Sequence, residues 1–171
     1  MYFVIVIATT IVLPIGSAVA ETLWVYQGIV DSGGWIAPPL ADVALPLLGK
    51  WYVFFAGGVR LFLAGIRQSF APAMTLSQIF GIDHKPSEHI VQELGFANLS
   101  IGLICLLSLP YPHLAPACAI AAGLFYGLAG LQHLRKRERN AQRTLAMATD
   151  LMVFVMLAAN VTTFMWHWPS P

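Results

Sequence analysis

Charged residues are scarce in this sequence. Asp, Glu, Lys and Arg make up 10% of its 171 residues, whereas soluble domains carry about 25%. Hydrophobic residues reach 58%, which is more apolar surface than a soluble core of this size could bury. The composition therefore excludes an ordinary soluble domain. A net charge of +1 without a basic face gives no reason to expect a nucleic-acid partner.

Motifs of known active sites are lacking as well. The chain has no G-x-S-x-G nucleophile turn, no Gly-rich phosphate loop and no HExxH zinc motif. No internal repeat or low-complexity tract divides it, so we expect residues 1–171 to form a single membrane domain. These absences favour a protein that is not an enzyme.

What the sequence does contain is long apolar runs, each close to the roughly 20 residues that cross a bilayer as a helix. They cover about 2–20, 47–68, 89–109, 113–134 and 144–165. The predicted fold class is an all-α integral membrane helical bundle, with four core transmembrane helices over 47–165 and an N-terminal transmembrane helix. Residues 21–46, rich in Gly, Pro and aromatics, are predicted to form an outer loop, and 166–171 a tail.

Basic residues predict the orientation of the bundle. Arg67 and Lys85 flank the connection after the second segment, and a run of arginines and lysines from Arg135 to Arg143 marks the connection after the fourth. Because cytoplasmic loops hold the excess of Lys and Arg, both connections should face the cytoplasm. We expect a bacterial inner-membrane protein with a cytoplasmic N-terminus and a periplasmic C-terminus.

The first segment has two interpretations. Ala18 and Ala20 before Glu21 match the small-residue pattern of a signal-peptidase site. However, the segment has no Lys or Arg before its apolar stretch, and Pro14 lies within it. We favour a retained helix over a cleaved signal peptide.

Four ionisable residues interrupt the apolar runs: Arg60, Glu93, His133 and Asp150. A charge at mid-helix costs roughly 2.5 to 3.5 kcal/mol on insertion scales, so it normally faces protein and finds a partner. Arg60 and Glu93 are nearly equidistant from the middle of their connection, as are His133 and Asp150 from theirs. The favoured interpretation is an Arg60–Glu93 ion pair that holds helices in register, with His133 and Asp150 hydrogen-bonded near the inner interface.

A functional interpretation competes with this structural one. Glu93 and Asp150 could be proton-titrating carboxylates beside a site for a quinone, a lipid headgroup or an anionic ligand, with Arg60 as the counter-charge. The candidate residues for either role are Arg60, Arg67, Gln68, Gln92, Glu93, Asn98, His133 and Asp150.

Helical periodicity assigns faces to the polar and small residues. His89, Glu93, Ala97 and Ser100 fall on one stripe of the third segment, and Gly95, Asn98 and Gly102 lie nearly opposite. In the fourth segment, Gly123, Gly127 and Gly130 form a face on which another helix can approach closely.

Metal and disulfide sites are weaker interpretations. His89 and Glu93 have i, i+4 spacing, and His133 or Asp150 could add a ligand, but this spacing has low specificity and we expect no metal. Cys105 and Cys118 are placed symmetrically about the turn LPYPHL, so a disulfide is conceivable. Inert packing of two free thiols is favoured, because no C-x-x-C pair is present.

Most of the chain after Lys50 resembles a widespread bacterial family of small multi-helix membrane proteins of unknown function. The runs that carry the resemblance are KWYVFFAGGVRLFLAGIRQ, FAPAMTLSQIFGI, VQELGFANLSIG and GLFYGLAGLQH, with a late Asp150. The resemblance implies that the family's polar positions are occupied here by Arg60, Gln68, Gln92, Glu93, Asn98, His133 and Asp150. The layout is more distantly similar to the DoxX-like group, some of whose members accompany quinone-linked oxidoreductases.

Three functional hypotheses follow. The first is a non-catalytic accessory or scaffold component, whose small-residue faces bind helices of a partner subunit or of a second copy. The second is a protein that binds a quinone or another small hydrophobic ligand and is linked to redox chemistry; apart from that quinone, no cofactor is expected. The third is a proton-coupled small transporter, which five spans without an inverted repeat make less favourable.

Overall fold

The structure is a computed structural model that describes residues 2–32, 38–77, 87–135 and 141–166. Its elements, in chain order, are α1 (Tyr2–Ile7), η1 (Ala8–Val12), α2 (Leu13–Asp31), α3 (Leu40–Tyr52), η2 (Val53–Arg60), α4 (Leu61–Phe70), α5 (Pro72–Thr75), α6 (Ser87–Leu107), η4 (Pro112–Leu114), α7 (Ala115–Arg135) and α8 (Ala141–Trp166). Elements η1 and η2 are π-helical, and η4 is a turn of 3₁₀-helix.

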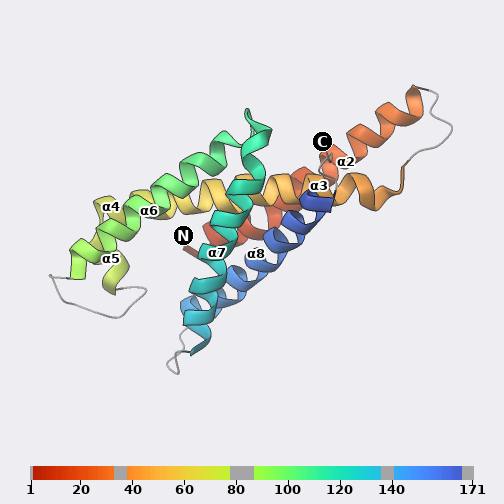
Figure 1. Ribbon diagram of the computed structural model, residues 1–171. Helices are drawn as coiled ribbons and strands as arrows, with labels where there is room; N and C mark the ends of the chain where they lie inside the picture. Colours follow the sequence, from red (N-terminus) through yellow and green to blue (C-terminus); the bar gives the residue numbers. More distant parts are fainter. Residues whose placement is uncertain (1, 33–37, 78–86, 136–140, 167–171) are drawn as a thin grey trace.

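These elements join into five helices that are long and apolar enough to cross a membrane (Figure 1). They span Phe3–Asp31, Leu40–Phe70, Ser87–Leu107, Pro112–Arg135 and Ala141–Thr162. Large apolar side chains such as Ile90, Leu128 and Val155 are 60–69% exposed on their outer faces, as expected where lipid replaces water. The predicted all-α membrane bundle of five spanning helices is confirmed.

The outer loop predicted over 21–46 is wrong in extent. Helix α2 continues to Asp31, and α3 already begins at Leu40, so most of this stretch is helical. The stretch ETLWVYQGIV contains a single glycine and no proline, whereas the breaking residues Pro38 and Pro39 come just before α3. Pro46 lies inside α3 without ending it.

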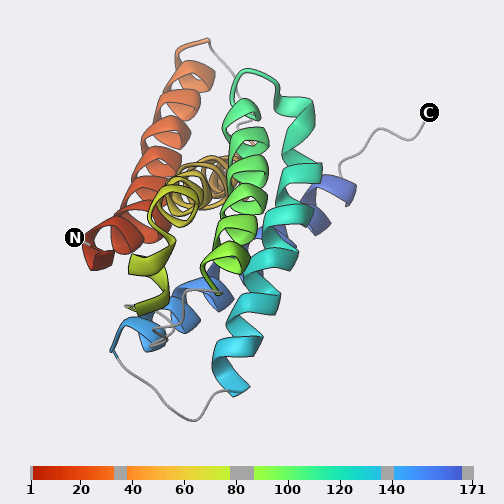
Figure 2. The same cartoon turned by 90° about the vertical axis from the view of Figure 1, so that its left-hand side faces the viewer.

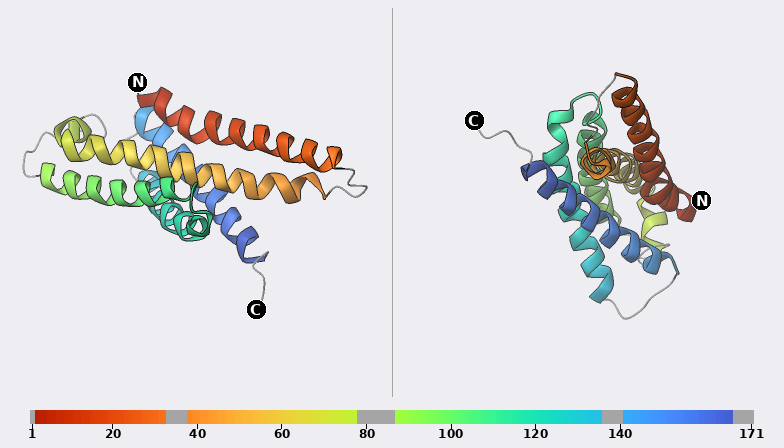
Figure 3. Two further views of the ribbon diagram at one scale, coloured as in Figure 1. Left: turned by 90° about the horizontal axis from the view of Figure 1, so that it is seen from above. Right: turned by 90° about the vertical axis from the view of Figure 1, so that its right-hand side faces the viewer.

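The continuous helix formed by α3, η2 and α4 runs through the centre of the bundle. Figure 2 looks down this helix, with α2 on one side of it and α6 and α7 on the other, and Figure 3 shows α2 lying along α3 and α6 lying along α4. Helices α7 and α8 form a second antiparallel pair across the bundle (Figure 1). Residues of the central helix can therefore reach all other long helices.

Glycines set the closest approaches. A Cβ at Gly102 of α6 would lie 2.5 Å from the Phe62 backbone nitrogen, so α4 and α6 touch through their backbones. A Cβ at Gly127 of α7 would lie 2.8 Å from the Phe154 ring on α8. The predicted close-packing face of α7 is confirmed at Gly127 and also at Gly130, where Leu151 would be met at 2.7 Å.

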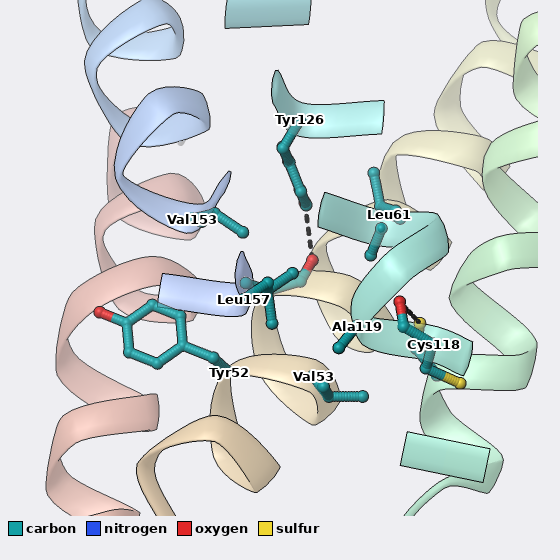
Figure 4. Packing of buried hydrophobic residues seen from close by; sticks show 11 residues of the cluster. Tyr52, Val53, Leu61, Cys118, Ala119, Tyr126, Val153 and Leu157 are labelled. Carbon is teal, nitrogen blue, oxygen red and sulfur yellow. Dashed lines mark hydrogen bonds between the residues drawn. The ribbon is translucent and has the colours of Figure 1, made fainter. Parts of the chain in front are cut away.

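Buried side chains of α3, η2, α4, α6, α7 and α8 form one core (Figure 4). Tyr52, Val53, Tyr126, Val153 and Leu157 are each no more than 1% exposed. Small residues such as Ala119 fill the space between them, so the helices interlock closely. This core lies directly beside Arg60.

Candidate functional site

Arg60 is the last residue of η2, where the π-helical segment gives way to α4. A π-helix closes i→i+5 hydrogen bonds, which widens the turn, and such segments are frequent at functional sites. The Arg60 side chain is 11% exposed. The central helix therefore carries a nearly buried positive charge at an unusual backbone geometry.

Asp150 of α8 neutralises this charge. Nη2 of Arg60 lies 2.6 Å from Oδ1 of Asp150, whose side chain is 7% exposed. The same Nη2 donates to the Thr149 hydroxyl at 3.3 Å, and Nη1 donates to the Thr10 hydroxyl at 3.4 Å. Thr10 belongs to η1, so one guanidinium joins the N-terminal helix, the central helix and α8.

Tyr126 of α7 closes the site from a fourth direction. The Arg60 guanidinium carbon lies 5.0 Å from the centre of its ring, within the range of a cation–π interaction. The Tyr126 hydroxyl donates to the Ala56 carbonyl at 2.6 Å (Figure 4). Because Ala56 lies in η2, this bond also satisfies a carbonyl of the π-helical segment.

The predicted Arg60–Glu93 pair is wrong. Glu93 is exposed, and neither an ion pair nor a hydrogen bond joins it to any residue that the structure describes. Gly102 lies against Phe62, and Gly95 lies against Ser69. This register places Glu93 eleven residues along the helix from the level of Arg60, about 16 Å away.

Three of the predicted polar residues form a separate set between α4 and α6. Asn98 donates through Nδ2 to Oε1 of Gln68 at 2.7 Å, and Gln92 donates to the Ser69 carbonyl at 3.3 Å. Asn98 is buried, and its Oδ1 has no hydrogen-bond partner within the described part of the chain; the same holds for the Ser69 hydroxyl. These contacts tie α4 to α6 but do not reach Arg60.

His133 and Arg67 are both half-buried. His133, in the last turn of α7, lies within electrostatic range of Asp150, so these two candidates belong to one region as predicted from their depth. Arg67, in the last turn of α4, lies seven residues beyond Arg60 on the side where Glu93 also lies. Of the eight candidates, Arg60, Asp150 and His133 belong to one site, and Gln68, Gln92 and Asn98 belong to the α4–α6 contacts. Arg67 and Glu93 are in neither set.

A second ion pair lies between α2 and α3, and sequence reasoning missed it. Lys50 donates to both oxygens of Glu21, at 2.6 and 2.9 Å, and Trp51 donates through Nε1 to Oε2 at 2.7 Å. The side chains of Lys50 and Glu21 are 37% and 25% exposed. Glu21 and Lys50 are equidistant from the α2–α3 connection, a symmetry that would have predicted the pair had 21–46 been recognised as helical.

The two cysteines lie at one depth, as the symmetry about their turn predicts. Cys105 and Cys118 are free thiols, 0% and 2% exposed, and Sγ of Cys105 lies 4.0 Å from the Cys118 carbonyl oxygen. Both belong to the buried core, in which Cys105 lies against Gly57 of η2. Figure 4 shows Cys118 in this core. Within the described residues, no group of three or more His, Cys, Asp and Glu side chains gathers at a common point.

Two of the surface hollows among the described residues are lined by other residues than the Arg60–Asp150 pair. One, of about 460 Å³, is lined by residues of the last part of α2, including Trp24, Gln27 and Asp31. The other, of about 220 Å³, is an apolar groove between α7 and α8 lined by residues such as Ile120, Leu124 and Phe154. Neither hollow includes Arg60 or Asp150.

Five spanning helices around a buried ion pair define a multi-pass helical membrane protein. The comparison with protein families narrows this class. The chain belongs to a family of unknown function (DUF6790), whose model matches residues 4–170. No curated protein and no solved structure matches it.

Proposed function

We propose that this chain is a non-catalytic accessory or scaffold component of a membrane assembly, set in a bacterial inner membrane with its N-terminus in the cytoplasm. The observation that carries the proposal is that protein side chains enclose the Arg60–Asp150 ion pair. Threonines of η1 and α8 and the Tyr126 ring surround the guanidinium, and both charged side chains are almost fully buried.

This enclosure of the ion pair favours a structural role for the two charges. A charge that serves a ligand in a membrane protein normally faces a cavity or a pathway. Here the two charges neutralise each other between helices, and neither residue lines the two hollows described above. Because an ion pair in a low-dielectric interior needs one geometry, it supports a single helix register.

Gentle-detergent purification followed by lipid and quinone extraction and native mass measurement tests the proposal. We expect no quinone at one per chain, together with a protein partner or a second copy at a fixed ratio. The control is Asp150→Asn, because a quinone carried only by detergent would be recovered equally from both proteins. A stoichiometric quinone that the wild type retains and Asp150→Asn loses would overturn the proposal and favour the quinone-binding alternative.

A further inference from the structure

Helix α6 exposes a polar stripe on its membrane-facing side. His89, Glu93, Ala97 and Ser100 are all exposed. The opposite face of the helix carries Gly95 and Gly102, which touch α4. The stripe therefore points away from the bundle.

Glu93 makes this face unusual. It is the seventh residue of a helix that is apolar enough to span a membrane, and no hydrogen bond or ion pair joins it to the residues described. Ser100 is different, because its hydroxyl donates to the Phe96 carbonyl at 2.8 Å. A carboxylate on a lipid-facing surface is costly unless another group approaches it.

His89 supplies such a group one helical turn away. It lies on the same face as Glu93, with no ion pair between the two within one chain. Its imidazole N–H can donate to a carboxylate. A surface with a donor and an acceptor one turn apart is complementary to itself.

Two copies in one membrane have the same orientation, so a twofold axis along the membrane normal sets their α6 helices side by side at equal depth. In such an interface, if residue i contacts residue j of the second copy, residue j contacts i. We infer that this chain forms a homodimer through α6, in which His89 of each copy donates to Glu93 of the other. Ala97 lets the two backbones approach, and Ile90 and Phe96, which are 69% and 57% exposed, cover the edges.

The dimer names the partner that the proposed function leaves open, and it rests on that function only in treating the bundle as a helix-binding component. A monomer bound to a foreign subunit would overturn the dimer and leave the proposed function intact. A bound quinone would overturn the proposed function whatever the oligomeric state.

Cysteine cross-linking in isolated membranes tests the interface directly. We expect Ala97→Cys to form a covalent dimer of twice the 18.6 kDa chain mass under mild oxidation. The matched control is Leu128→Cys, which is 67% exposed on α7 and should stay monomeric. The native cysteines are buried and can remain. Equal cross-linking at both positions, or none at Ala97→Cys, would overturn the inference.

A charge swap tests the reciprocal contact. We expect Glu93→His and His89→Glu each to raise the dimer dissociation constant in lipid nanodiscs by roughly tenfold, because each leaves two like groups facing each other. The double variant H89E/E93H should restore the wild-type value. Because both side chains are exposed, thermal unfolding of the monomer should be unchanged in all three. A double variant as weak as the single ones would contradict the contact.

Discussion

Two ion pairs of identical length hold the central helix to its neighbours. Lys50 and Glu21 are separated by 2.6 Å, as are Arg60 and Asp150. The first pair is 37% and 25% exposed, whereas the second is 11% and 7% exposed. Distance therefore does not distinguish them, and the difference in surroundings must decide what each contributes.

The surroundings differ in kind. Glu21 accepts from the Trp51 indole, Lys50 lies 4.9 Å from the centre of the Trp51 ring, and both charges of this pair are partly exposed. Arg60 is enclosed by Thr10, Thr149 and the Tyr126 ring, and its own backbone lies in a π-helical segment. Replacing one residue of a buried ion pair is strongly destabilising, whereas replacing both residues by apolar ones is often tolerated. An exposed ion pair contributes little to stability, so either replacement should have a small effect.

Breaking the buried pair should produce the largest effect. Arg60→Leu leaves the Asp150 carboxylate buried without its counter-charge, so we expect the free energy of unfolding to fall by about 3–5 kcal/mol. The double variant R60L/D150L should recover most of this loss, because no charge is then stranded. Reversible unfolding in mixed detergent micelles, followed by circular dichroism, measures both.

The comparison variant is Lys50→Leu, which removes the cation of the exposed pair from the same continuous helix. A loss as large as that of Arg60→Leu would show that burial does not separate the two sites. A double variant R60L/D150L no better than the single one would show that the contribution of Arg60 goes beyond its pairing with Asp150.

The next largest effect concerns the Tyr126 hydroxyl. The Tyr126 ring faces Arg60 as the Trp51 ring faces Lys50, but the Tyr126 hydroxyl also donates to a carbonyl of η2. Tyr126→Phe keeps the ring over Arg60 but removes the hydroxyl that donates to the Ala56 carbonyl of η2. Losing one hydrogen bond of this kind costs about 0.5–1.5 kcal/mol. Tyr111→Phe, at a 53% exposed position, is the control and should be nearly neutral in the same measurement. Equal losses in the two variants would argue against a role for this bond.

The class of fold follows from composition and from the lengths of the apolar runs, since lipid accepts few structures other than helices. The partner of Arg60 cannot be predicted from composition or from the lengths of the apolar runs. Depth estimated from the middle of the α4–α6 connection assumes that the chain turns symmetrically, but α5 intervenes and the glycine contacts shift the register. Asp150 lies ninety residues from Arg60, and no local pattern relates two helices so far apart.

The α2–α3 hairpin shows the opposite case. Two of the contacts between these helices, Glu21–Lys50 and Thr10–Arg60, are both nearly symmetric about the connection. The symmetric estimate holds here because α2 and α3 pack along each other. The information was present in the sequence but was hidden by the Gly, Pro and aromatic residues that favoured a loop.

Removing the charge of Glu21 should have a smaller effect. Glu21→Gln keeps an oxygen for the Trp51 indole and loses the attraction to Lys50, so we expect a loss of about 0.2–1 kcal/mol, as for exposed pairs. Glu21→Ala removes both interactions and should cost more. If Glu21→Gln lost nearly as much stability as Arg60→Leu, the Glu21–Lys50 pair would contribute as much as the buried Arg60–Asp150 pair, and exposure would not distinguish them.

The smallest expected effect is that of ionic strength on the coupling energies of the two ion pairs. The screening length falls from about 10 Å at 0.1 M salt to about 3 Å at 1 M, but only solvent-accessible charges feel this change. We therefore expect the coupling energy between Glu21 and Lys50, measured by a double-mutant cycle, to shrink by a few tenths of a kcal/mol in high salt. The coupling between Arg60 and Asp150 should stay constant, because Tyr126 and the two threonines keep ions away from it. If salt weakened both couplings equally, water and ions would have access to the Arg60–Asp150 pair. The pair would then not be enclosed by protein, and the argument for its structural role would fail.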